Sequence, residues 1–518
     1  MYDLVLAGGQ VIDGTRRAPY KANICISGNR IAKITEDAVR GAHTLDVTGL
    51  AVTPGFIDIH THSDAVPFSK LTLDSKISQG VTTEVNGNCG SSILPATGKN
   101  SAPAERYAMD PSAPPYFASV SDYAAAAKPT LINYACLVGH SALRLSVMGF
   151  ENRHPTDDEL QQLKALLAQQ LQQGAFGLSL GLIYPPSAFS ATEELVELAK
   201  VVAQYGGILS VHMRNEGPRV FEAVDEVLEI ARRSGVHLQI SHLKLQGAPQ
   251  WGKAHLLLDK LRAARAEGIR VTCDQYPFCA SSTGLKALVP NWAHDGGMEA
   301  MAERLKAKEG DIPEKILENI ALRGGTDAIM IAKTTPNCLH YLGMTLTEIC
   351  QELALDPVDA VIHILLESNC ITQAMYFNMS EEDMLAIMSQ DFISVGSDGS
   401  SVVLDSRKKD TLLHPRNYAT FPRFFQTVRE NRLMPVEDAV YKMTGLPAGI
   451  LGLQDRGVLK EGNIADITVF DPAVFASPAT FRVPAVRPVG LHHVIVGGKP
   501  ALENGVLTGE RNGIVLLK

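Results

Sequence analysis

Two histidines, His60 and His62, directly follow the largely apolar segment 55–59, which has the composition of a buried strand. Side chains alternate between the two faces of a strand, so residues two positions apart point the same way. Two neutral imidazoles side by side at a strand end provide half of a metal site. The pair alone is weak evidence, because two unrelated histidines can end a strand by chance.

Four further segments of this kind end in residues that can bind a metal or transfer a proton. They are His212 after segment 208–211, His242 after 236–241, Asp398 after 392–397, and Cys89 after 82–88. In a barrel of parallel strands the functional residues lie at the carboxyl ends of the strands. The sequence therefore predicts that these residues meet His60 and His62 at one mouth.

Strand-like segments alternate with helical patterns along the middle of the chain. The predicted strands span residues 52–60, 81–86, 131–138, 177–182, 208–212, 238–242, 270–274 and 392–397. The helical patterns between them include 156–173, 192–205, 220–234 and 254–268. This alternation is typical of a parallel sheet, whose strands are apolar because both faces are buried. It predicts an α/β fold with a TIM-like (β/α)₈ barrel over residues 51–450.

The two ends of the chain instead contain short strand-like segments separated by turns. The predicted strands are 3–7, 10–13, 23–27, 30–34, 466–470, 490–496 and 514–517. Gly8-Gly9 and Gly28-Asn29 supply turns, because glycine and asparagine tolerate positive φ. We expect residues 1–50 and 451–518 to form one small β-sandwich domain built from both termini.

An insertion near residues 285–342 separates the seventh and eighth predicted strands. A connection of this length in a barrel is usually a lid or a binding loop. The alternative is an addition to the surface without a role at the site.

Composition disfavours several classes of protein. The 518 residues carry a formal net charge of -9, with acidic and basic residues interspersed, which disfavours binding to nucleic acid or anionic membranes. We see neither an apolar run that could span a bilayer nor a secretory signal at the start. Eight scattered cysteines fit buried thiols in a reducing compartment. We therefore expect a cytoplasmic protein that binds neither nucleic acid nor membranes.

The chain resembles the N-acyl-D-amino-acid deacylases, or D-aminoacylases, of the metal-dependent amidohydrolase superfamily. The matching motifs span essentially the whole chain and lie at residues 54–64 (PGFIDIHTHSD), 87–90 (GNCG), 177–185 (GLSLGLIYP), 212–216 (HMRNE), 241–244 (SHLK), 274–277 (DQYP), 397–399 (SDG) and 414–416 (HPR). The histidine pair is shared widely across the superfamily. The motifs after the second and fourth strands are more specific to this family.

The resemblance implies a zinc centre without the lysine that bridges two metals in many amidohydrolases. The predicted fourth strand, 177–182, contains no lysine, and a thiolate can supply the negative ligand instead. By resemblance, one tightly bound Zn²⁺ is held by Cys89, His212 and His242. A second, weaker position is formed by His60, His62 and Asp398. On residue type alone, Cys89 could be a small buried hydrophobe, which is our interpretation of Cys136.

The expected mechanism follows from these ligands. Zinc lowers the pKa of a bound water toward about 7 and polarises the amide carbonyl. Asp398 would accept the proton of the water and later give it to the leaving nitrogen; its alternative is an ordinary turn aspartate. His140, after the third strand, could help to polarise the carbonyl or could support the site from behind.

The substrate carboxylate also needs a partner, and the planar fork of arginine matches its two oxygens. Arg416, after the eighth strand, is the residue that the resemblance favours. Tyr276 and Lys244 are further candidates, and each of these three could instead be a surface residue. Tyr184 and His140 complete the predicted substrate-binding set. Asp58 shares a strand face with His60 but lies deeper, so we interpret it as structural.

The implied function is hydrolysis of N-acyl-D-amino acids, which are small-molecule substrates. Family members that prefer acidic side chains place an arginine after the seventh strand, whereas segment 283–292 has none and contains Lys286. This favours neutral or apolar side chains. Two alternatives remain: a cyclic amidase of the hydantoinase or dihydroorotase type, which normally carries the bridging lysine, and a barrel that has lost its metal. The sequence does not indicate an oligomeric state.

Overall fold

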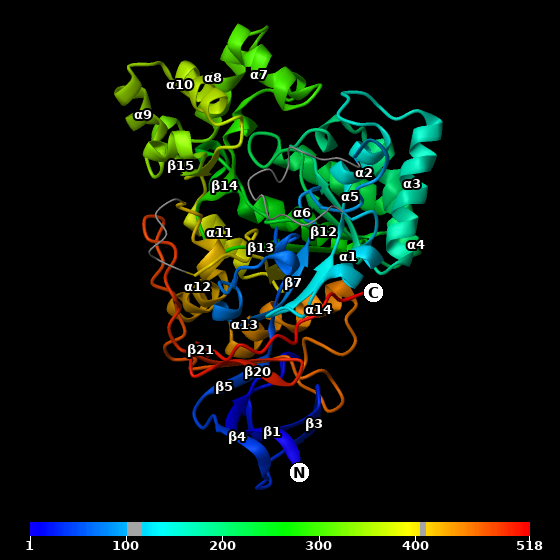
Figure 1. Ribbon diagram of the computed structural model, residues 1–518, viewed down its shortest axis with the longest axis vertical. Coiled ribbons are helices and arrows are strands. Elements are labelled where there is room, and N and C mark those ends of the chain that lie inside the picture. Colours follow the sequence, from blue (N-terminus) through cyan, green and yellow to red (C-terminus); the bar gives the residue numbers. More distant parts are fainter. Residues whose placement is uncertain (101–116, 405–410) are drawn as a thin grey trace.

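Strands from both ends of the chain form one sheet at the end of the molecule that holds the N-terminus (Figure 1). The computed structural model describes residues 1–100, 117–404 and 411–518. The nine strands are β1 (Tyr2–Val11), β2 (Tyr20–Ser27), β3 (Arg30–Thr35), β4 (Gly41–Asp46), β5 (Ala51–Pro54), β18 (Ile467–Phe470), β19 (Leu491–Val496), β20 (Lys499–Glu503) and β21 (Val506–Leu507). Their order is β21-β20-β19-β18-β5-β1-β2-β3, with β4 beside β1. A β domain built from both termini is therefore confirmed.

Parallel strands form the predicted barrel in the middle of the chain. They are β6 (Phe56–Asp58), β7 (Val81–Asn86), β8 (Asn133–Cys136) with its continuation β9 (Val138–Gly139), β10 (Gly177–Gly181), β11 (Ile208–His212), β12 (His237–Ile240), β13 (Val271–Gln275) and β17 (Ile393–Val395). Hydrogen bonds arrange them as β6-β7-β8 and β9-β10-β11-β12-β13-β17. The predicted (β/α)₈ architecture is confirmed.

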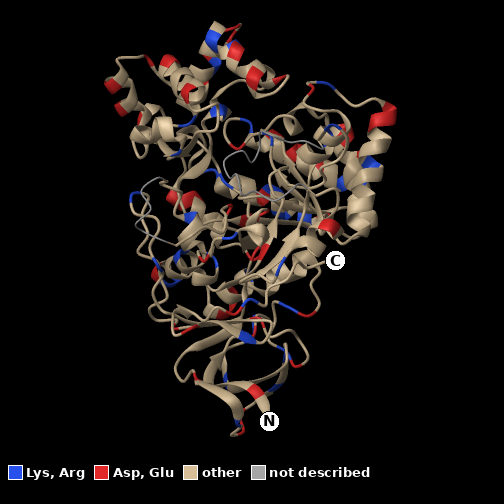
Figure 2. Cartoon of the chain, in the orientation of Figure 1, with Lys and Arg blue, Asp and Glu red and all other residues tan. Residues whose placement is uncertain are grey.

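Helices follow the barrel strands close to their predicted positions. They are α1 (Val120–Ala126), α2 (His140–Val147), α3 (Asp157–Gln172), α4 (Thr192–Gln204), α5 (Val220–Ser234), α6 (Ala254–Ala266), α11 (Glu381–Met388), α12 (Arg416–Asn431), α13 (Val436–Met443) and α14 (Gly445–Leu451). Thr156 and Glu159 form a capping box at the start of α3, which explains why that helix begins where predicted. None of the helices in the described parts of the chain is long and apolar enough to cross a membrane. Acidic and basic residues are interspersed over these helices (Figure 2).

The first predicted strand, 52–60, is in fact two strands. β5 pairs antiparallel with β18 in the terminal sheet, whereas β6 pairs parallel with β7 in the barrel. The chain changes sheet at Gly55, where an added Cβ would overlap the side chain of Thr82. The continuous apolar run concealed this break, since both halves are buried.

Two details at the termini also differ from the prediction. Gly8-Gly9 forms an irregularity within the single strand β1 and not a turn between two strands. The tail at 514–517 does not join the terminal sheet, because Val515 bridges to Tyr134 of the barrel strand β8. The consecutive apolar residues 514–517 were compatible with either partner.

The insertion forms a module with a hydrophobic core of its own, at the end of the molecule opposite the terminal sheet (Figure 1). It contains α7 (Met298–Ala307), α8 (Ile312–Leu322), α9 (Leu346–Leu353), α10 (Pro357–Glu367) and the three-stranded sheet of β14 (Ser281–Gly284), β15 (Ile329–Lys333) and β16 (Gln373–Tyr376). Residues beyond 342, such as Ile349 and Leu365, pack into the same core as Leu285 and Ile316. β14 therefore connects this module directly to the end of β13.

Candidate metal centre and active site

The predicted metal ligands converge on one end of the barrel. His60 and His62 follow β6, and the others follow or end β7, β11, β12 and β17. Their ligand atoms form two groups, and all atoms of a group lie within 4.8 Å of one another. The groups are His60, His62, Cys89 and Asp398, and Cys89, His212 and His242.

Cys89 belongs to both groups, whereas the resemblance implied a place in the second group alone. Its Sγ lies 3.2 Å from Nε2 of His60 and 3.5 Å from Nε2 of His242. Burial alone would raise the pKa of this thiol, but His60 and His242 lower that pKa well below its usual value. The thiolate form that binds metals is therefore favoured.

Three of these residues have a left-handed backbone: Cys89 with φ 52°, His242 with φ 35° and Asp398 with φ 51°. Residues other than glycine rarely adopt such angles, which cost on the order of 1–3 kcal/mol each. Strain of this kind concentrates at functional sites, where surrounding contacts maintain it. Here it accompanies the sharp turn of the chain at each strand end.

His212 has two buried ring nitrogens that no hydrogen bond satisfies among the described residues. Its ring lies edge-on to that of His242, with centroids 4.4 Å apart, and burial lowers the pKa of His212. Buried polar atoms normally have a partner. A neutral imidazole without one, beside a thiolate, fits a metal ligand.

Asp274 orients His60, and the sequence analysis assigned it no role. Oδ1 of Asp274 lies 3.1 Å from Nδ1 of His60 and accepts the backbone N–H of His242 at 2.8 Å. Gln239 donates to the other carboxylate oxygen at 2.9 Å. Because a carboxylate only accepts, His60 carries its hydrogen on Nδ1, and Nε2 is left facing Cys89. A carboxylate behind a histidine is the usual arrangement around protein-bound metals.

Glu216 is a second residue without a predicted role. Its carboxylate lies 3.0 Å from Nδ1 of His242 and accepts from Lys244 at 2.6 Å and from Gln246 at 2.9 Å. Burial alone would raise the pKa of Glu216, but Lys244 and the two histidines lower it. Lys244 is itself buried, with Nζ 2.7 Å from Nδ1 of His242. Lys244 is therefore not a solvated surface lysine.

Asp398 lies between the histidine pair and an arginine. Oδ1 lies 3.0 Å from Nε2 of His62 and 3.4 Å from Nε2 of His60, and Oδ2 lies 2.7 Å from Nη1 of Arg416. Burial alone would raise the pKa of Asp398, but Arg416 and then His242 lower it well below its usual value. This carboxylate is therefore held in its ionised form.

Arg416 and Tyr276 lie together beside Asp398. The guanidinium lies 5.2 Å from the centroid of the Tyr276 ring, and its Nη2 donates to the carbonyl of Ser282 at 3.1 Å. The buried Tyr276 hydroxyl has no hydrogen-bond partner among the described residues. An arginine beside an unsatisfied hydroxyl is suited to binding a carboxylate.

Tyr184 links the barrel mouth to the insertion. Its hydroxyl lies 2.9 Å from that of Thr283 on β14, and its ring lies edge-on to His212, with centroids 5.0 Å apart. Tyr184 therefore lies at the edge of the predicted metal group. β14 also contacts Arg416 through Ser282, so one strand of the insertion contacts two predicted substrate-binding residues.

His140 is fully buried, and both of its ring nitrogens are already in contact with protein groups. Nε2 lies 2.9 Å from Glu194 and Nδ1 lies 2.7 Å from Ser187. Arg144 pairs with the same carboxylate at 2.6 Å. Burial lowers the pKa of His140. These contacts favour the supporting role over direct polarisation of a substrate carbonyl.

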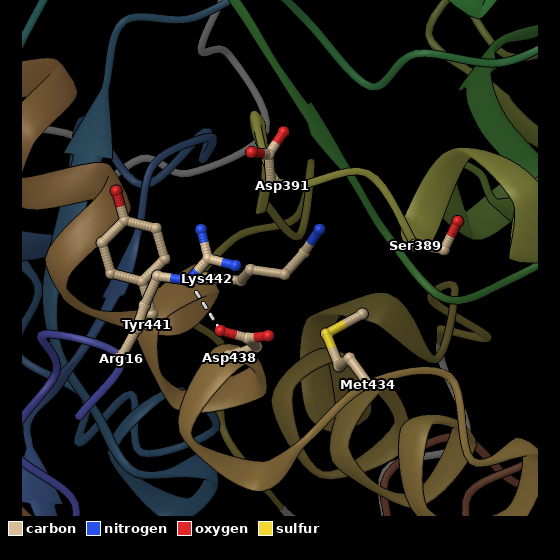
Figure 3. A pocket seen from close by; sticks show the side chains of 7 residues that line it. All are labelled: Arg16, Ser389, Asp391, Met434, Asp438, Tyr441 and Lys442. Carbon is tan, nitrogen blue, oxygen red and sulfur yellow. Dashed lines mark hydrogen bonds and ion pairs between the residues drawn. The ribbon is translucent and has the colours of Figure 1, made fainter. Parts of the chain in front are cut away.

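A small cavity lies away from this site and is drawn in Figure 3. Its lining residues are Arg16, Ser389, Asp391, Met434, Asp438, Tyr441 and Lys442. Asp391 precedes β17 whereas Asp398 follows it, so the cavity and the candidate ligands lie at opposite ends of the same strand. Function in such barrels resides at the carboxyl ends of the strands. The cavity is therefore not a second part of the candidate site.

The burial of Lys442 beside this cavity should make the free energy of unfolding depend on pH. The amine is buried and donates to the carbonyl of Gln390, and burial lowers its pKa from 10.5 to about 7, partly opposed by Asp391. Between these values the unfolded chain binds a proton that the folded chain does not. The wild type should therefore gain stability as the pH rises above 7, by up to about 1.4 kcal/mol per unit. The Lys442→Met variant lacks this dependence. Urea unfolding should therefore show that the free energy of unfolding of the wild type rises relative to that of the variant from pH 7 to pH 9. A difference that does not vary with pH would contradict the expectation.

Comparisons with known proteins agree with this geometry. The family model described as "Amidohydrolase family" matches residues 43–321 and 406–501. The chain is 37% identical over 521 residues to a D-aminoacylase of Alcaligenes xylosoxydans xylosoxydans, covering 100% of this chain and 98% of the relative. It is also 37% identical over 500 residues to an N-acyl-D-glutamate deacylase of the same organism, covering 96% and 93%.

One of several solved structures that match over the full length of both chains contains bound zinc. It is the N-acyl-D-glutamate deacylase of Bordetella bronchiseptica in complex with zinc and a phosphonate inhibitor that mimics the tetrahedral intermediate. The TM-score is 0.85 and the sequence identity is 35%, with 100% of each chain covered. The similarity therefore includes the barrel, the terminal sheet and the insertion.

Proposed function

The chain belongs to the amidohydrolase family, within its D-aminoacylase group, and from this membership we propose that it is a zinc-dependent N-acyl-D-amino-acid deacylase. It hydrolyses the linear amide bond of its small-molecule substrate to give a carboxylate and a free D-amino acid. Neutral or apolar side chains are preferred.

The observation that carries this proposal is the sharing of Cys89 by two groups of imidazole and carboxylate donors. A thiolate and neutral imidazoles are the donors that Zn²⁺ favours in proteins. The unsatisfied nitrogens of His212 and the carboxylate behind His60 support the same assignment. We propose that Cys89, His212 and His242 hold one tight ion, and that His60, His62 and Asp398, with Cys89 shared, form a weaker position.

The reaction divides between the ion and the chain's own groups. Zinc at this site would supply Lewis-acid activation of a water and of the amide carbonyl. Asp398, kept ionised by Arg416, accepts the proton of the attacking water. The same carboxylate then returns a proton to the departing nitrogen, which is possible because the two transfers are sequential.

Arg416 and Tyr276 would bind the carboxylate of the substrate next to Asp398. The guanidinium supplies charge and the free hydroxyl of Tyr276 supplies a second donor. Tyr184 would line the site beside His212, and Lys244, whose amine lies 5.8 Å from the centroid of the Tyr276 ring, also holds Glu216 against His242. His140 supports this end of the barrel through Glu194 without contacting the substrate.

The preference for the side chain is inferred from segment 283–292. Sequence identity does not decide it, because relatives named D-aminoacylase and N-acyl-D-glutamate deacylase are both 37% identical to this chain. The segment contains no arginine to pair with an acidic side chain. Lys286 is its basic residue, and its amine lies 3.7 Å from the sulfur of Met298 in the insertion.

A substrate screen tests this proposal directly. Purified protein with added zinc should release D-leucine from N-acetyl-D-leucine faster than D-glutamate from N-acetyl-D-glutamate. It should be inactive on N-acetyl-L-leucine and on hydantoins. Hydrolysis of the L-isomer alone, or of a hydantoin alone, would overturn the assignment.

Arg416→Ala is expected to raise KM for free-acid substrates about 10- to 100-fold. A charge-assisted contact to a carboxylate contributes about 1.5–3 kcal/mol. The variant also removes the partner of Asp398, so kcat should fall for every substrate. Steady-state kinetics on N-acetyl-D-leucine and on its amide separate the two effects, because the amide has no carboxylate to bind.

The matched control is Arg429→Ala on the same helix, α12. The Arg429 guanidinium donates to the carbonyls of Pro472 and Phe475, so its loss should leave KM unchanged. Equal changes in KM for acid and amide would show that Arg416 shapes its loop and does not bind the substrate carboxylate.

A further inference from the structure

The first and last barrel strands, β6 and β17, meet at a seam. Among the described residues they belong to separate hydrogen-bonded sheets, so no ladder joins them. Backbone bonds beyond the strand ends connect them instead: the N–H of Asp398 donates to His60 at 2.9 Å, and that of His62 donates to Gly399 at 2.8 Å. Asp398 therefore lies on one side of the seam and the histidine pair on the other. The distances between Asp398 and the two histidines depend on the contacts that hold the two sides together.

Three fully buried charged residues lie under this seam. Lys76, Asp58 and Glu84 are each 0% exposed. The Lys76 amine lies 2.6 Å from Oδ2 of Asp58 and 3.7 Å from Oε1 of Glu84. One positive charge thus faces two carboxylates in the interior, where an unneutralised charge is costly.

Asp58 and Lys76 together hold the residue that precedes Asp398. Oδ1 of Asp58 accepts the backbone N–H of Ser397 at 2.8 Å, and Lys76 donates to the Ser397 hydroxyl. The same hydroxyl accepts the N–H of Gly399 at 3.0 Å. Both neighbours of Asp398 are therefore tied to the buried ion pair, while Asp398 itself has a left-handed φ of 51°.

Glu84 bridges the two sides of the seam. Its carboxylate accepts from the hydroxyl of Ser63 at 2.9 Å and from that of Ser401 at 2.7 Å. Ser63 directly follows His62 and in turn accepts the backbone N–H of Ser401 at 2.7 Å. The loops after β6 and β17 are thus joined by side chains whose charge Lys76 balances.

Stability alone is a weak explanation for such a cluster. Apolar residues of similar volume often replace a buried ion pair without loss of stability. A hydrophobic replacement would, however, remove the hydrogen bonds that the three charged residues make to Ser397, Ser63 and Ser401. The directional contacts of the cluster are therefore its distinctive contribution.

We propose that Lys76, together with Asp58 and Glu84, is a positioning group that fixes the spacing of His60, His62 and Asp398 across the barrel seam. The inference deepens the proposed function, since it concerns the weaker metal position and the proton-transfer group of the same site. Without Lys76 the Ser397 hydroxyl loses a donor and the two carboxylates lose the cation that contacts both, so the seam loosens. The ligand group that spans the seam is then weakened. His212, which ends β11, and His242, which follows β12, are not affected, because these two strands pair directly.

Lys76→Met tests the proposal by a metal measurement and by a kinetic one. Equilibrium dialysis against Zn²⁺ should show a 10- to 100-fold higher Kd for the weakest-bound zinc equivalent. With N-acetyl-D-leucine, kcat should fall by a similar factor while KM stays within about two-fold. An unchanged Kd and kcat would overturn the proposal.

Lys442→Met is the matched control. Lys442, on α13, is also a buried lysine. It donates to the carbonyl of Gln390, which precedes β17, so it lies near the end of that strand opposite Asp398. Its replacement should leave Kd and kcat unchanged. Equal losses of zinc affinity and kcat in both variants would assign the effect to general destabilisation and would contradict the proposal.

Charge can be separated from volume by a double variant. Lys76→Met with Glu84→Gln restores the net charge of the cluster and keeps an acceptor near Ser63. It should recover part of the lost kcat and zinc affinity, and a double variant no better than Lys76→Met would contradict the proposal.

If Lys76→Met does not fold, Ser397→Ala keeps all three charges but removes the hydroxyl that Lys76 contacts, and should raise Kd by several-fold. A wild type inactive on N-acyl-D-amino acids would refute the proposed function, whereas the zinc comparison would still decide the positioning role.

Discussion

Replacing Cys89 with alanine is expected to remove the tightly bound zinc and to reduce hydrolysis to the background rate. Cys89 is the one residue shared by both ligand groups, and its thiolate is the only sulfur donor in either. The loss should exceed the roughly 10²–10⁴-fold effect typical of a proton-transfer group, because the variant loses the metal itself. Elemental analysis of the purified variant and its rate on N-acetyl-D-leucine are the two measurements.

Two matched variants make this test specific. Cys89→Ser keeps the volume but offers a harder oxygen donor, so it should retain less zinc than the wild type and more than Cys89→Ala. Cys136→Ala removes a thiol that is also buried but lies outside both groups, and burial raises the pKa of that thiol. Its zinc content should be normal. A Cys89→Ala protein with full zinc occupancy would show that Cys89 is not a ligand.

Sequence periodicity predicted the barrel because its strands are buried on both faces and alternate with helices that bury one face. α5 begins and ends at the predicted residues, 220 and 234. Periodicity failed where two sheets adjoin. Residues 52–58 read as one apolar strand, although hydrogen bonds divide them between β5 and β6. β5 pairs with β18 near the other end of the chain, whereas β6 pairs with β7, and a local pattern cannot report such partners.

The candidate ligands were predictable for a related reason. Each stands at the end of an apolar strand, and barrel topology brings such ends together. Asp274 and Glu216 also stand near strand ends, but their importance comes from contacts with His60 and His242 that spacing does not reveal. Lys76 was harder still to identify, because it precedes a short 3-10 helix (Ile77–Gln79) and resembles an ordinary surface lysine. Only its complete burial against Asp58 and Glu84 distinguishes it.

The backbone at Asp398 makes this residue well suited to substitution. Its φ of 51° lies in the left-handed region, which asparagine and glycine tolerate better than most residues. Asp398→Asn and Asp398→Gly should therefore keep the local fold, whereas alanine would add strain. A loss of activity in the first two variants can then be assigned to the carboxylate and not to the backbone.

Asp398→Asn should retain zinc at Cys89, His212 and His242 but lose about 10²–10⁴-fold in kcat, since both proton transfers pass through this carboxylate. The amide keeps the shape of the side chain but cannot accept the proton of the attacking water at neutral pH. Asp398→Gly leaves space in which added formate can act as a substitute base, so formate should restore part of its rate. Formate should not help Asp398→Asn, whose amide fills that space. Activity of Asp398→Asn within a few-fold of the wild type would mean that another group transfers the proton, and would return Asp398 to the role of a metal ligand alone.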